Sequence, residues 1–99
     1  MNEIMAAPEF TPGAVGRALT AAGFAEYDKA DKSTAGFHLG DARDRGEILA
    51  EVLGGLANPP YWTPAEHSEH RALLRQFQDT LDAAGYQTVI EDRMVVITR

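Results

Sequence analysis

One short phrase occurs twice in this chain and constrains its fold more than any other feature. The first copy, LTAAGF, spans residues 19–24, and the second, LDAAGY, spans residues 81–86. Each copy closes an amphipathic segment. Because glycine adopts a left-handed backbone conformation that other residues resist, Gly23 and Gly85 are each expected to end a helix, with the next aromatic residue folded back onto the last turn. Two helices that stop in the same way are therefore predicted.

Matching start signals precede both phrases. Thr11 and Thr63 each supply an N-cap hydroxyl, and each is followed by a proline in the first helical position. Glu66 completes a capping box with Thr63. The first helix has one apolar stripe, formed by Val15, Ala18, Leu19 and Ala22. The second covers about residues 64–84, and its apolar face consists of Leu73, Leu74, Phe77, Leu81 and Ala84.

The segments that follow each helix have the patterns of strands. Residues 24–28 and 35–39 predict a hairpin joined by a polar connection. Residues 88–90 and 94–98 are rich in β-branched side chains and predict a second hairpin, around residues 91–93.

Residues 46–54 fit two structures. As a helix, they have a capping box from Asp44 and Glu47 and a stop at Gly54. As a strand, they alternate along their length, with Ile48, Ala50 and Val52 on one face and Leu49, Glu51 and Leu53 on the other. The segment is short for a helix and follows residues suited to a hairpin turn, so the strand is favoured.

These elements predict an α+β domain, with an antiparallel sheet and two helices on one of its faces. The expected order is helix, two or three strands, helix, two strands. A chain of 99 residues, of which 44% are hydrophobic, suffices for one core. We expect a flexible arm at residues 1–10 and a single domain over residues 11–99, with a proline-rich bridge at residues 58–64.

The end of the chain resembles that of small actinobacterial proteins from plasmids, phages and integrative elements, which share an L-x-x-A-G-Y … V-V-x-T-R pattern. The matching residues are Leu81, Ala84, Gly85, Tyr86, Val95, Val96, Thr98 and Arg99. These residues are structural, so the resemblance implies a genetic context and no particular activity.

Charge and cysteine content exclude several classes of function. The formal charge is −6, from fifteen acidic and nine basic residues, so the chain is repelled by phosphate backbones unless its bases cluster. The absence of cysteine excludes disulfides, thiol catalysis and cysteine-ligated metals. No apolar run has the length of a membrane span, and the first residues lack the features of a leader. We expect a cytoplasmic protein without a membrane partner.

No catalytic signature stands out. His67 and His70 share a helix face, and Glu66 or His38 would supply a third zinc ligand, but no complete ligand set follows at a recognised spacing. A solvated, polar helix start is the favoured interpretation. Four glutamates that would pair for acid–base chemistry are also interpreted as solvated surface, namely Glu47, Glu51, Glu66 and Glu69. We predict no enzymatic activity, no metal and no cofactor.

A protein-interaction module, acting as an adaptor or inhibitor, is the first functional hypothesis. Tyr61 and Trp62 form an aromatic cluster of the kind that dominates interfaces, although packing against their own sheet is the favoured alternative. The terminal strand, with Val96 and Thr98, is expected to offer a free sheet edge to a protein partner or to a second copy in a homodimer. The acidic surface would also attract a basic partner.

The alternative is a small DNA-binding transcriptional regulator. In this hypothesis the first helix enters the groove with Arg17, and the hairpin behind it acts as a wing that carries Lys29 and Lys32. No helix is predicted before residue 11 to complete a helix-turn-helix, and the net charge opposes DNA. Nucleic acid is therefore the less expected partner.

Overall fold

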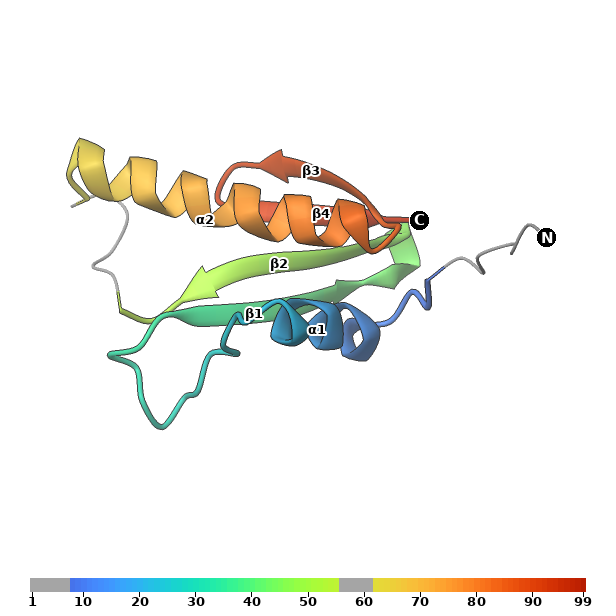
Figure 1. Ribbon diagram of the computed structural model, residues 1–99, viewed down its shortest axis with the longest axis horizontal. Coiled ribbons are helices and arrows are strands. Elements are labelled where there is room, and N and C mark those ends of the chain that lie inside the picture. Colours follow the sequence, from blue (N-terminus) through green and yellow to red (C-terminus); the bar gives the residue numbers. More distant parts are fainter. Residues whose placement is uncertain (1–7, 56–61) are drawn as a thin grey trace.

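Two helices and four strands follow one another in the order α-β-β-α-β-β (Figure 1). The computed structural model describes residues 8–55 and 62–99. The elements are α1 (Pro12–Ala21), β1 (Gly36–Ala42), a 3-10 turn η1 (Arg43–Arg45), β2 (Glu47–Leu53), α2 (Pro64–Ala83), β3 (Gln87–Glu91) and β4 (Met94–Thr98). The predicted α+β class is confirmed, and residues 46–54 contain a strand rather than a helix. The proline-rich bridge lies largely outside the described residues.

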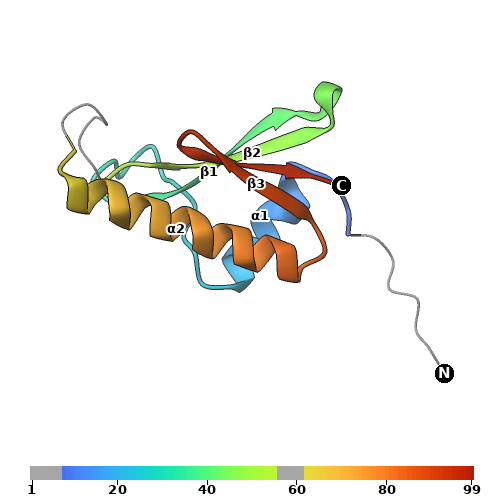
Figure 2. The ribbon, with the colours of Figure 1, turned by 90° about the horizontal axis from the view of Figure 1, so that it is seen from above.

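The four strands form one antiparallel sheet in the order β1-β2-β4-β3. Each helix precedes one hairpin in the sequence: α1 comes before β1 and β2, and α2 comes before β3 and β4. The two helix–hairpin units meet where β2 pairs with β4. Both helices lie on the same face of the sheet, as Figure 2 shows. No helix or strand of residues 8–55 and 62–99 covers the other face.

The repeated phrase ends both helices at its glycine, as predicted, and does so with the same hydrogen bonds at each copy. The N–H of Phe24 donates to the carbonyl of Leu19 at 3.1 Å, and the N–H of Tyr86 donates to that of Leu81 at 3.0 Å. Gly23 and Gly85 have φ values of 97° and 101°. This is the Schellman arrangement, in which a residue of positive φ lets the chain fold back over the last turn.

The predicted hairpin between residues 24–28 and 35–39 is wrong. Residues 24–28 form no strand, and Glu26 makes a single parallel bridge with Phe37. The N–H of Phe37 donates to the carbonyl of Ala25, and the N–H of Tyr27 donates to the carbonyl of Phe37, both at 2.9 Å. The backbone of residues 26–27 passes so close to Gly36 that a Cβ there would collide with it. A parallel crossing of this kind leaves no register for an antiparallel hairpin.

The core lies between the helices and the sheet. The rings of Phe24 and Phe37 both meet the ring of Phe77 edge-on, with centroids 4.8 and 6.4 Å away. The other buried members are Phe10, Val15, Leu19, Ile48, Ala50, Leu74, Leu81, Tyr86, Val95 and Ile97.

Part of the segment expected to be an arm packs against the domain. Phe10 belongs to the core, and the carbonyl of Glu9 accepts a hydrogen bond of 2.6 Å from the Tyr86 hydroxyl. The guanidinium of Arg99 lies over the Phe10 ring, 5.3 Å from its centroid. Residues 1–7 lie outside the described part of the chain.

Candidate functional site

An apolar row crosses all four strands on the face of the sheet that carries no helix. Strand register places Gly40 beside Leu49, Leu49 beside Val96, and Val96 beside Val89. Their neighbours along the strands, among them Ile48, Val95 and Ile97, belong to the core, so alternation directs the row to the opposite face. We call this row the open-face row.

The open-face row differs in exposure along its length. Val96 lies at its centre and is 7% exposed, whereas Val89 on the edge strand is 58% exposed. Leu49 is partly buried and lies over Gly40, where an added Cβ would be only 3.6 Å from that of Leu49. The row is therefore a packed strip that ends in an exposed valine.

Two rows of mixed side chains flank the open-face row, and they contain three glutamates. On one side lie His38, Glu51, Met94 and Glu91, and on the other lie Ala42, Glu47, Thr98 and Gln87. His38 Nδ1 is 3.3 Å from Glu51 Oε1. The open face thus has an apolar centre and a mixed border, in which three of the eight residues are glutamates.

The expectation that residues 94–98 offer a free sheet edge is wrong. β4 is an inner strand, with β2 on one side and β3 on the other. The reason is the pairing of residues 48–51 with β4, a contact between segments far apart in the sequence. Val96 lies instead in the open-face row, and Thr98 lies in a flanking row.

Trp62 lies elsewhere, at the start of α2. Its ring centroid is 5.0 Å from that of His67 and 4.8 Å from that of His70. The structure therefore does not bring Trp62 together with Val96 and Thr98, because α2 packs on the opposite face of the sheet. Tyr61 lies outside the described residues.

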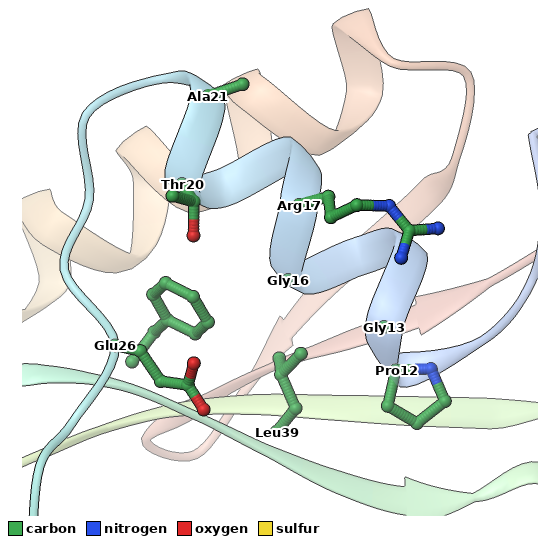
Figure 3. Close-up of a pocket in the computed structure, with 9 residues that line it drawn as sticks. Pro12, Gly13, Gly16, Arg17, Thr20, Ala21, Glu26 and Leu39 are labelled. Carbon is green, nitrogen blue, oxygen red and sulfur yellow. The ribbon is translucent and has the colours of Figure 1, made fainter.

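A groove of about 600 Å³ separates α1 from the edge strand β1 (Figure 3). Gly13, Gly16 and Thr20 line its helical side, and Leu39 rises from β1 toward Gly16. A Cβ added at Gly16 would lie 3.4 Å from Leu39 Cδ1, so the glycine is compatible with a small side chain. Phe37 and Leu39 supply apolar surface to the groove, and Glu26 and Arg17 add one charged side chain of each sign.

The residues of the DNA-binding alternative lie in one helix and in an irregular connection. Arg17 lies in α1, where its Nη2 is 3.3 Å from Glu9 Oε2. Lys29 and Lys32 lie in the connection between α1 and β1, and the hairpin that would have carried them as a wing is absent. No helix precedes α1 within residues 8–55.

The residues considered for metal or acid–base chemistry are also separated. His38 lies on the open face, whereas His67 and His70 lie on α2. Glu66 serves the capping box, where its side chain accepts from the N–H of Thr63. Within the described part of the chain, no three histidine, aspartate or glutamate side chains are grouped to hold a metal ion.

Sequence reasoning missed Leu49 and Val89. The available signal was that residues 47–53 carry apolar side chains on both faces if they form a strand. One face of such a strand packs on the helices, and the apolar side chains of its other face must contact solvent or another molecule.

Comparison with models of protein families, with curated proteins and with solved structures finds no match to this chain. Of the two helices in the described residues, neither is long and apolar enough to cross a membrane.

Proposed function

We propose that this chain is a non-catalytic protein-interaction module that binds a partner protein through the helix-free face of its sheet. The observation that carries the proposal is the open-face row, an apolar strip bordered by glutamates and ending in the 58% exposed Val89. Apolar centres with polar borders are typical of protein interfaces.

The charge on this face specifies the partner's chemistry. Glu47, Glu51 and Glu91 border the row, and the whole chain carries a formal charge of −6. A complementary partner presents apolar side chains surrounded by lysine or arginine. A second copy of this chain is a poorer fit, because face-to-face contact would bring glutamates of both copies together.

Site-specific photo-crosslinking tests the proposal. A photoreactive amino acid replaces Val89 in one variant and Gln76, exposed on α2, in the control. We expect a discrete crosslinked protein from position 89 and none from position 76, because α2 lies on the other face of the sheet. No discrete product from position 89, or the same product from both positions, would overturn the proposal.

A point variant then measures the contribution of the row. Val89→Asp adds a charge to the edge of the interface, and we expect it to weaken binding to the crosslinked partner at least about tenfold. Gln76→Asp adds the same charge on α2 and should leave binding unchanged. Equal binding by both variants would contradict a role for the open-face row.

A further inference from the structure

A depression of about 340 Å³ lies between the first half of α2 and the turn that joins β3 to β4. Two arginines, two histidines, a serine and an aspartate line it, together with the apolar side chain of Leu74. The polar lining residues are His67, Ser68, His70, Arg71, Asp92 and Arg93. We call this depression the basic pocket.

Two of the nine arginine and lysine residues of the chain, Arg71 and Arg93, line this one depression. The single carboxylate in the lining, Asp92, already faces one of the arginines, with its Oδ1 3.9 Å from Arg93 Nη1. Arg71 is the second arginine of the lining, and Asp92 is its single carboxylate. With both imidazoles neutral, the charged side chains of the lining are two arginines and one aspartate, so the lining carries a net positive charge.

His70 is the buried polar member of the basic pocket. The residue is 6% exposed, and burial lowers the pKa of its imidazole. The charges of Arg93 and His67 lower this pKa further. A bound anion would offset these like charges.

His67 and Ser68 lie in the first turns of α2, and the N–H of His67 already donates to the carbonyl of Thr63 at 3.1 Å, so what these two residues offer the pocket is their side chains. The basic pocket combines these side chains with those of a second element, the β3–β4 turn.

We propose that the basic pocket binds a phosphate group. Arginine offers a fork of N–H donors that matches phosphate oxygens, and Arg71 and Arg93 approach from two different elements. The Ser68 hydroxyl and the two imidazoles supply further donors. This site lies on the side of the sheet opposite the open-face row and does not depend on the proposed function.

Trp62 provides the readout, because it is the only tryptophan and its ring adjoins both imidazoles of the pocket. The full chain is titrated with inorganic phosphate near neutral pH, with chloride added to hold the ionic strength constant. We expect a saturable change in tryptophan fluorescence. A change that never saturates, or that chloride alone reproduces, would overturn the proposal.

Matched arginine variants assign the signal to the pocket. Arg93→Gln should weaken phosphate binding about tenfold, because it removes a charged hydrogen-bond donor. Arg75→Gln removes the same charge from an exposed position on α2 outside the pocket, and it should change the affinity less than about twofold. Equal effects of the two variants would show that binding follows net charge only and would overturn the site.

Titration with O-phosphoserine distinguishes the source of the phosphate, since tighter binding than inorganic phosphate indicates a monoester on a larger molecule.

Discussion

Gly23 and Gly85 hold backbone angles that side chains resist, with φ values of 97° and 101°. We expect Gly23→Ala to lower the free energy of unfolding by about 1 kcal/mol through backbone strain, since nothing lies within 4 Å of the added Cβ. Gly85→Ala should cost more, because its Cβ would lie 3.2 Å from Pro8 Cδ. Urea unfolding of the two variants checks this order. Unchanged stability, or the reverse order, would contradict the helix stops described above.

The buried imidazole of His70 makes stability depend on pH. Burial, Arg93 and His67 hold its pKa below the ordinary value of 6.5. The unfolded chain therefore binds the proton more readily, so this contribution to stability is complete above about pH 6.5 and is lost as the pH falls through the lowered pKa. His70→Gln should remove that part of the profile, and His38→Gln, on the open face, should retain it. Urea midpoints measured across this range test the difference.

The carboxylate of Asp31 should affect stability in a lower pH range than His70 does. Hydrogen bonds from Ser33 and Thr34 to the Asp31 carboxylate lower its pKa from the ordinary value of 3.8. The stability that these bonds contribute is present above that value and is lost at still lower pH. The two groups are therefore distinguishable in one pH series. A stability loss that begins only below about pH 4 would show that His70 contributes nothing.

At the scale of the elements, the position of each strand sets the cost of a substitution. Ile97 on the inner strand β4 is fully buried, whereas Val89 on the edge strand β3 is 58% exposed. We expect Ile97→Ala to destabilise the protein by about 2–4 kcal/mol, because it leaves a cavity between sheet and helices. Val89→Ala should change stability by less than about 1 kcal/mol. Chemical denaturation checks both values, and similar costs at the two positions would contradict the strand order.

The helices show how far element boundaries follow from the sequence. The bounds of α2, Pro64–Ala83, are within one residue of the predicted end, and both hydrogen bonds of the predicted capping box at Thr63 are present. Caps and stops join residues three to five positions apart, so the information for them is local. Residues 24–28 were mispredicted because their only strand-like contact, with Phe37, is a parallel crossing that depends on the connection between α1 and β1.

For the whole molecule, the acidic charge should control how fast a partner binds. If a basic protein docks on the open face, raising salt from about 50 mM to about 500 mM should slow association at least tenfold, because screening removes the steering force. The dissociation rate should change less. Stopped-flow or surface-binding kinetics with the crosslinked partner provide the measurement. An association rate that is insensitive to salt would show that the glutamates do not select the partner.

The candidate site shows the limits of sequence reasoning at this scale. Val96 was singled out as part of a free edge, yet β4 is paired on both sides and Val96 lies within the open-face row. Leu49 and Val89 come from strands distant in sequence and meet Val96 only through sheet register. The basic pocket likewise brings His67 and His70 together with Arg93. Strand alternation and helical periodicity in the sequence cannot predict that these residues are close in space.

Local patterns in the chain were enough to establish two helices with their caps and stops, an α+β class and the terminal hairpin, because these features depend on hydrogen bonds and periodicities within a few residues. The order of the strands, the uncovered face and the basic pocket arose only on folding. They depend on which distant segments pair, and pairing is decided by the burial of side chains from the whole chain in one core.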